Sequence, residues 1–264
     1  MNAHPPRRIT VVLHDKPQSQ WLLELGARIA SQLQAELEAV FVEDAALYRL
    51  TGLPFLRELK RDSFTEEQLD ATRLQKEWRT MAKLAKDALE SSATQAGLNW
   101  SFRVWRGEFD SDMQELGLES SMLLLGRLNA PIPSRYPSSH RPNRPTPTSP
   151  LKLGVILDDG ETTERLLEAV GDLSRKPEIQ LILFLLPDGL PADDSAIEQR
   201  LAEIDPQHHN ILLRLSDKDQ ANLTLRLKAA ACDLLMISES SELLRGQGMK
   251  QRLKGLPFPV VLVR

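Results

Sequence analysis

The stretch Ile179-Gln-Leu-Ile-Leu-Phe-Leu-Leu186 decides the fold class of this chain. It is a short run in which every residue but one is apolar. A strand of a parallel sheet is covered on both faces and so has a nearly continuous apolar sequence. A strand with one solvent-exposed face instead alternates apolar and polar residues. The run therefore predicts a central strand of a parallel sheet.

Similar short runs lie on both sides of this stretch, and segments with helical spacing separate them. We expect strands at 9–13, 37–42, 98–104, 122–125, 151–157, 211–215, 234–237 and 260–263. Between them apolar residues recur every three to four positions, which is typical of helices that pack one face on a sheet. Strands that alternate with helices, without hairpin turns such as Asn-Gly, favour parallel sheets with right-handed crossovers.

The longest predicted helix has signals at both of its ends. Ser63 and Glu66 match a capping box, and Gly97 is a natural C-cap. The strand that follows alternates strictly from Leu98 to Val104. We therefore expect this strand to lie near a sheet edge, where one face is less covered.

The segment from Asn129 to Pro150 divides the chain. It contains seven prolines and four serines, and proline removes backbone donors and restricts φ, so neither a helix nor a sheet continues through it. We predict a first domain over 1–128, a proline-rich linker over 129–150 and a second domain over 151–264. Each domain is expected to be an open parallel sheet, five-stranded in the second domain and without a clear fifth strand in the first.

The composition is that of a soluble globular protein: 41% of its 264 residues are hydrophobic and 27% are charged. With a net charge of −4, neither domain has the basic surface that nucleic-acid binding needs. The polar start and the absence of an apolar run of about 18 residues predict neither a secretory signal nor a membrane span. The single cysteine, Cys232, cannot form an internal disulfide, so we expect a cytoplasmic protein.

The second domain resembles the universal stress proteins at three places. These are Val155-Ile-Leu-Asp-Asp-Gly-Glu-Thr-Thr-Glu164, Cys232-Asp-Leu-Leu-Met-Ile-Ser238 and the run from Gly246 to Val263. The first domain is similar more loosely, at 42–44, 50–58, Gly107 and 123–126. The resemblance implies two tandem flavodoxin-like, adenine-nucleotide-alpha-hydrolase-like α/β sheets. It also implies that the two halves pair with each other or that the chain forms a homodimer, and that ATP or AMP is the candidate ligand.

The resemblance also nominates binding residues. The candidates are Asp15, Val42, Gly126, Asp158, Asp159, Gly246 and Gly248. In the family the Asp after the first strand faces the adenosine, but the same residues also suit simple helix capping. The glycine-rich phosphate loop after the fourth strand is broken here, because Ser238-Glu-Ser-Ser-Glu-Leu-Leu-Arg245 has no glycine and two acids that would repel phosphate. We therefore predict a degenerate nucleotide site.

No pattern in the sequence nominates catalytic residues or a metal site. His208 and His209 are adjacent and would face opposite sides of a strand, and Cys232 is expected to be packed in the core. Three functions stay open: a non-enzymatic, stress-associated regulatory or interaction protein with an unknown protein partner, an ATP or AMP sensor, and a slow nucleotide hydrolase. A lid over 43–62 is expected either to roof a cavity beside Asp15, Val42 and Gly126 or to fill it with Leu53 to Leu56.

Overall fold

The computed structural model describes residues 7–14, 16–53, 55, 57–59, 65–68, 70–107, 119–126, 150–158, 163–174, 179–186, 211–214, 223–241, 243–244, 256 and 258–264. The elements before the proline-rich segment, here called the first half, are β1 (Arg8–Leu13), α1 (Lys16–Leu33), β2 (Glu36–Asp44), α2 (Ala45–Leu50), β3 (Arg57–Leu59), β4 (Glu66–Gln68), α3 (Ala71–Ala96), β5 (Trp100–Gly107) and β6 (Met122–Leu125). Those after it, the second half, are β7 (Leu151–Leu157), α5 (Thr163–Ser174), β8 (Ile179–Leu185), β9 (Ile211–Arg214), α8 (Leu223–Ala229), β10 (Leu234–Ser238) and β11 (Val260–Val263).

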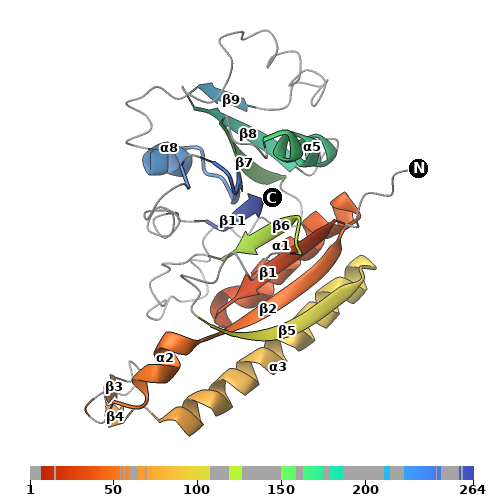
Figure 1. The fold of residues 1–264 in the computed structure, drawn as a ribbon. Coiled ribbons are helices and arrows are strands. Elements are labelled where there is room, and N and C mark those ends of the chain that lie inside the picture. Colours follow the sequence, from red (N-terminus) through yellow and green to blue (C-terminus); the bar gives the residue numbers. More distant parts are fainter. Residues whose placement is uncertain are drawn as a thin grey trace.

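Nine of the eleven described strands form one sheet in the order β5-β2-β1-β6-β11-β10-β7-β8-β9, and β3 and β4 form a separate pair (Figure 1). Within each half of the nine-stranded sheet, neighbouring strands are parallel, which confirms the predicted mixed α/β architecture with a mostly parallel sheet. The predicted central strand, β8, lies between β7 and β9. The division into domains at 128 and 151 stays a prediction, because residues 129–149 lie outside the described part of the chain.

The two halves meet through one strand from each. β11 pairs with β10 in parallel and with β6 in the antiparallel direction, with Val260 opposite Leu125 and Val263 opposite Met122. β11 therefore lies beside β6, where a fifth strand of the first half would otherwise lie. Because this pair is antiparallel, the carboxyl ends of the strands in the two halves point to opposite edges of the sheet.

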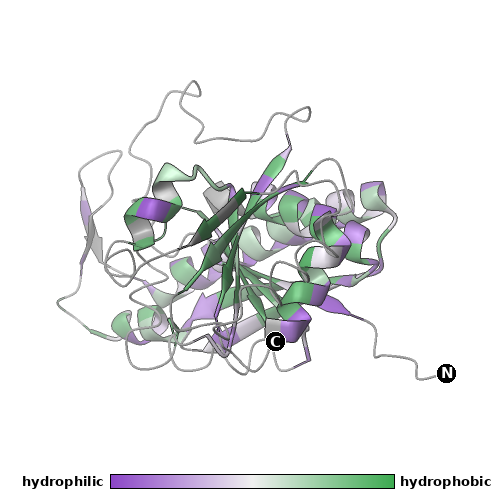
Figure 2. Ribbon diagram, turned by 90° about the horizontal axis from the view of Figure 1, so that it is seen from above, coloured by the Kyte–Doolittle hydropathy of each residue, from purple (hydrophilic) through white to green (hydrophobic). Residues whose placement is uncertain are grey.

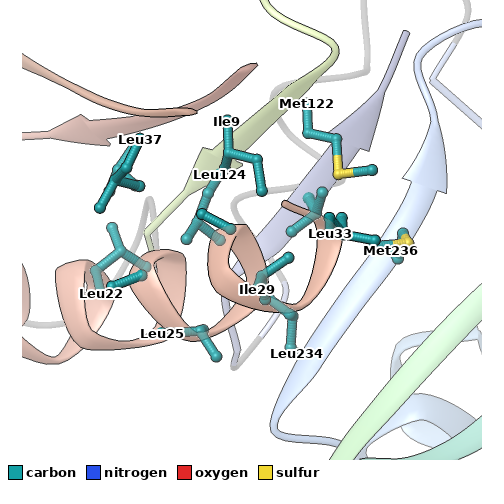
Figure 3. Close-up of a cluster of buried hydrophobic side chains, with 14 of the residues drawn as sticks. Ile9, Leu22, Leu25, Ile29, Leu33, Leu37, Met122, Leu124, Leu234 and Met236 are labelled. Carbon is teal, nitrogen blue, oxygen red and sulfur yellow. The ribbon is translucent and has the colours of Figure 1, made fainter. Parts of the chain in front are cut away.

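Helices cover the sheet from both faces. Apolar residues of α1, α3 and α5 pack on one face, and Leu227 of α8 packs on the other. Seen from above, the strands form a mostly hydrophobic layer (Figure 2). α1 spans the junction of the halves: Ile29 and Leu33 lie beside Leu234 and Met236 of β10 (Figure 3).

Gly26 allows α1 to lie this close to the sheet. A Cβ atom at this position would be 2.6 Å from Cγ2 of Val11 and 3.3 Å from Cδ1 of Leu37. Both neighbours are buried strand residues that have little room to shift. The helix that joins the cores of the two halves therefore depends on a residue without a side chain.

A buried polar ladder crosses the first half on the face opposite α1. Glu38 accepts hydrogen bonds from the Thr10 hydroxyl, at 2.7 Å, and from Nε of Arg103, at 3.0 Å. The Thr10 hydroxyl also lies at hydrogen-bond distance from that of Ser120. The buried carboxylate thus has hydrogen-bond partners, as burial requires, and the ladder links β1, β2, β5 and Ser120, which lies two residues before β6.

The predicted start of the long helix was wrong. α3 begins at Ala71, where the Asp70 carboxylate accepts a hydrogen bond from the Thr72 backbone N–H, whereas Glu66 belongs to β4. The short antiparallel hairpin β3–β4 was not predicted, because its three-residue strands carry mostly charged residues. Gly97 ends the helix with a φ of 66°, as the C-cap prediction required.

The predicted edge strand is confirmed, since β5 is the terminal strand of the sheet next to β2. It runs to Gly107, further than predicted, and Val104 on it is exposed. Two of the segments between the predicted strands, 197–204 and most of the one from Ser241 onward, lie outside the described residues. Within the described part of the chain, no helix is both long and apolar enough to span a membrane.

Candidate functional site

Open parallel sheets bind ligands at the carboxyl ends of their strands, at the topological switch point where the strand order reverses, here called the winding point. In the first half this point lies between β1 and β6, and in the second half between β7 and β10. Because the halves are antiparallel to each other, the molecule has two such points at opposite edges.

In the second half, three charged residues follow directly after three neighbouring strands. Asp158 follows β7, Glu239 follows β10 and Arg264 follows β11. The register places these strand ends side by side, with Ile156 opposite Ile237 and Ser238 opposite Val263. The three residues therefore form a row across the winding point.

Asp158 is only 3% exposed, and its carboxylate accepts a hydrogen bond from the Ser241 hydroxyl. Ser241 is itself fully buried, and its Oγ accepts a hydrogen bond from the Leu243 backbone N–H at 3.3 Å. The loop after β10 is thus folded down onto the residue after β7. The capping role of Asp158 stays a prediction, because residues 159–162, between Asp158 and the first described residue of α5, Thr163, lie outside the described part of the chain.

Glu239 and Arg264 form a second link at this edge. Nη2 of Arg264 lies 2.8 Å from Oε1 of Glu239. The Glu239 backbone N–H donates to the Val263 carbonyl at 2.8 Å, so the pair is anchored to β11. Glu239 thus lies in an ion pair at this edge, and the expectation that its charge repels a phosphate stays a prediction. Glu242 lies outside the described residues.

Apolar side chains pack around the same edge. Leu186 and Leu244 are both buried and belong to one cluster with Ile237. Of the residues nominated from sequence for this half, Asp158 lies in the row, whereas Asp159, Gly246 and Gly248 lie outside the described part of the chain.

In the first half the corresponding edge is built differently. The residue directly after β1 is His14, which is partly exposed, so His14 occupies the place that Asp158 has after β7. Val42 is only 2% exposed and packs with Val12 and Val40, so it is a core residue in this structure. Gly126 is partly exposed directly after β6. Asp15 lies outside the described residues, so the predicted cavity beside it stays a prediction.

An aromatic and charged cluster holds the base of the lid. Tyr48 of α2 lies with its ring centroid 6.4 Å from that of Trp78, and its hydroxyl accepts a hydrogen bond from Nε2 of Gln75 at 3.0 Å. The guanidinium carbon of Arg106 is 5.3 Å from the Tyr48 ring, and Arg106 also pairs with buried Glu43 at 2.6 Å. Sequence reasoning missed this cluster, because its members come from β2, α2, α3 and β5.

The lid beyond this base carries exposed apolar side chains. Leu53 is 38% exposed, Phe55 is 76% exposed and Leu50 is also exposed. α2 and the β3–β4 hairpin project beyond the ends of β2 and β5 (Figure 1). Whether the lid roofs a cavity or fills it stays a prediction, because Asp15, Pro54 and Leu56 lie outside the described residues.

Cys232 lies in the core of the second half. Burial, and next the Asp233 carboxylate, raise the pKa of the thiol to about 11. A thiol with this pKa is protonated at neutral pH and is a poor nucleophile. Among the described residues, no three or more His, Cys, Asp or Glu side chains come together in a way that could hold a metal ion.

No protein-family model and no curated protein match this sequence at a significant level. Solved structures do match its fold. A universal stress protein from Archaeoglobus fulgidus DSM 4304 is 11% identical with a TM-score of 0.54, and the match covers 97% of this chain and 96% of that one.

Two further structures match with lower scores. The functionally unknown protein PA1789 from Pseudomonas aeruginosa PAO1 is 13% identical over 98% of this chain and 92% of that one, with a TM-score of 0.45. Universal stress protein UspA from Lactobacillus plantarum is 12% identical over 81% of this chain and all of that one, with a TM-score of 0.28. The strand order and the first of the three matches together show that this chain has the α/β fold of the universal stress proteins.

Proposed function

We propose that this chain is a non-enzymatic, stress-associated regulatory or interaction protein whose nucleotide site is degenerate. The observation that carries the proposal is the hydrogen bond from Ser241 to Asp158, which closes the winding point of the second half with the chain's own side chains. The fold match supports the association with universal stress proteins, and the residues at the edge support the loss of ligand binding.

The closure has an energetic consequence for any ligand at this edge. A ligand that uses the Asp158 carboxylate has to displace the Ser241 hydroxyl. A hydrogen bond to a charged group contributes about 1.5–3 kcal/mol. The ligand also has to separate a loop that is anchored by the Glu239–Arg264 ion pair and packed with Leu244. These costs are expected to weaken nucleotide binding in the second half.

The lid of the first half supports an interaction role. Its exposed Leu50, Leu53 and Phe55 follow each other closely in the chain. Neighbouring exposed apolar side chains are typical of surfaces that contact other proteins. The base of the lid is held rigidly by Tyr48, so such a surface would be presented in one orientation.

Titration calorimetry of the full chain with ATP, ADP and AMP tests the proposal. We expect no binding tighter than a Kd of about 10 µM, which corresponds to roughly −7 kcal/mol. A lower Kd for any of the three nucleotides would contradict a degenerate site. Activity assays with the same nucleotides are expected to show no turnover above the protein-free rate.

The alternative function is that of an ATP or AMP sensor, and the lid favours the first half as its site. Leu53 and Phe55 of the lid are exposed, so their side chains are able to contact a ligand at this edge. If nucleotide binding is observed, the pair His14→Ala and Ser241→Ala assigns it. Loss of binding in His14→Ala alone would place the nucleotide in the first half.

A further inference from the structure

The nine-stranded sheet ends in one long strand, β5, which is the outermost strand of the first half (Figure 1). The other terminal strand, β9, has only four described residues, whereas β5 has eight. The last strand of the chain, β11, has a neighbour on each side and therefore offers no free edge. Natural proteins keep edge strands short, because a long edge is a template for pairing with a further strand. β5 is thus the place where this sheet is able to grow.

The pairing of β5 with β2 fixes which backbone groups of β5 face outward. The Leu37 backbone N–H donates to the Asn99 carbonyl at 3.0 Å, and Leu37 is opposite Trp100 in the register. Along a strand, successive residues point their backbone groups alternately to one neighbouring strand and to the other. The odd-numbered residues of β5 therefore bond to β2. The even-numbered residues from Trp100 to Arg106 direct their backbone N–H and C=O groups to the outer edge.

The side chains along this edge are open to solvent, and their charges are compensated within the chain. Val104 is 48% exposed, and the side chains of Arg103 and Arg106 are 42% and 50% exposed. Arg103 pairs with Glu38 of β2, and Arg106 pairs with Glu43 of β2. Charged residues on an edge strand usually keep a second strand away. Here each charge has a carboxylate on the neighbouring strand, so its repulsion is weakened.

We propose that β5 pairs with β5 of a second copy of this chain, antiparallel and around a two-fold axis at Val104, so that the two sheets become continuous. The inference goes beyond the proposed function, because it concerns self-association and involves neither the nucleotide site nor the lid. A two-fold axis lets one edge serve as both partners, which is the commonest symmetry of soluble oligomers.

The outward backbone groups and the charges together select this register. Exchange of hydrogen bonds requires even-numbered residues to lie opposite even-numbered ones, so the two-fold axis passes through a single residue that faces its own copy. An axis at Arg103 would bring two guanidinium groups together, and like charges directly opposite each other are unfavourable. Axes further from the middle of β5 pair fewer of its residues.

An axis at Val104 avoids both problems. It places Arg103 opposite Trp105 of the second copy on one face of the sheet, and Arg106 opposite Phe102 of the second copy on the other. Phe102 and Trp105 are partly exposed, and they pack against the cores on opposite faces. A guanidinium beside an aromatic ring is favourable, so the same strand supplies both members of each pair.

Sedimentation velocity of the full chain over a concentration series tests the proposal. We expect wild type to dimerise with a Kd of about 1–100 µM, as is typical of a small interface. Val104→Lys places two like charges at the axis and should raise the Kd at least about tenfold. Val104→Pro removes an outward N–H without removing a hydrogen bond to β2 and should weaken the dimer similarly. Leu84→Lys on α3 is the matched control, because Leu84 is 49% exposed, and it should leave the Kd unchanged.

Cysteine cross-linking tests the register. Val104→Cys should form an intermolecular disulfide under mild oxidation, because paired residues of this kind have Cα atoms about 5.5 Å apart, within disulfide range. Ser101→Cys should not do so, because Ser101 would lie opposite Gly107 of the second copy. Leu84→Cys is the control for random collisions, and wild type, whose Cys232 is buried, is the baseline.

Wild type that stays monomeric at about 1 mM would overturn the proposal. A dimer that withstands both Val104→Lys and Val104→Pro, or cross-linking of Ser101→Cys as fast as that of Val104→Cys, would do the same. If the lysine and proline variants fail to fold, the difference in cross-linking between Val104→Cys and Leu84→Cys decides. None of these results bears on the proposed function, which nucleotide titration tests separately.

Discussion

The carboxyl edge of the second half is closed by the chain itself, whereas that of the first half carries a projecting lid with exposed apolar residues. In the second half Asp158 follows β7 and is covered by Ser241. In the first half His14 has the equivalent place, and Phe55 of the lid points into solvent. The comparison teaches that two halves with the same strand order can differ in the chemistry of their carboxyl edges, because the loops after the strands determine which side chains are exposed there.

The largest expected effect tests whether the two halves are one folding unit. Leu124 is fully buried in β6, opposite Val261 of β11. Leu124→Ala should lower the free energy of unfolding by about 2–5 kcal/mol. Because α1 packs on both halves, chemical denaturation followed by fluorescence and by circular dichroism should show a single, shifted transition. Leu84→Ala on the exposed face of α3 is the control, with an expected change below about 0.5 kcal/mol. Two separate transitions would show that the halves unfold independently.

The closure of the second half is tested by Ser241→Ala. This change removes the hydroxyl that donates to buried Asp158, so it should cost about 1.5–3 kcal/mol of stability in urea unfolding. Ser240→Ala is the matched control in the same loop. Its hydroxyl is partly exposed and bonds to a neutral partner, so the cost should stay below about 1 kcal/mol. Equal effects of the two substitutions would argue against the closure.

The buried thiol of the second half predicts a stability loss at alkaline pH. In the folded state the pKa of Cys232 is raised from its ordinary value of 9.0 to about 11. The folded protein therefore holds its proton when the unfolded chain has lost it. The stability from this group is complete below pH 9 and is lost as the pH rises through 11. At pH 10 the loss should be about 1 kcal/mol.

Cys232→Ala should remove this part of the pH dependence. Unfolding of wild type and variant is compared at pH 8 and pH 10, so that the constant cost of losing the side chain cancels. An identical pH dependence of the two proteins would show that Cys232 is not buried as the structure has it.

The smallest expected effect concerns the lid of the first half. Tyr48→Phe keeps the ring against Trp78 and Arg106 but removes the hydrogen bond from Gln75, so it should cost about 0.5–1 kcal/mol. The effect should be local. Tryptic cleavage after Arg57 is expected to become about threefold faster, while global unfolding hardly changes. Phe55→Ser, which alters only the exposed tip, should leave the cleavage rate unchanged.

Much of the fold was predictable from local patterns. Continuous apolar runs such as 179–186 identify strands that are covered on both faces, and the strict alternation after Leu98 identifies the edge strand β5. The order of the elements along the chain predicts parallel pairing, because a helix between two strands returns the chain to the same edge. The start of α3 was misplaced, because Ser63 and Glu66 match a capping box, whereas the helix uses Asp70 as its N-cap without a Glu or Gln three positions on.

The candidate site was predictable only in part. Asp158 was found because it directly follows an apolar run. The loss of the glycine-rich loop is evident from the sequence, because residues 238–245 contain no glycine. The hydrogen bond to Ser241, 83 positions away, was not predictable. The cluster around Tyr48 joins four elements, and no spacing along the chain indicates that Arg106 lies over its ring.

The amino-acid sequence alone determined which segments become strands and helices and that they alternate, since burial patterns act over a few neighbouring residues. Only the tertiary structure decided that β11 serves as neighbour to both β10 and β6, which sets the two carboxyl edges in opposite directions. It likewise decided that Glu239 forms an ion pair with Arg264. These outcomes depend on distances between residues far apart in the chain, and such distances exist only once the sheet has formed.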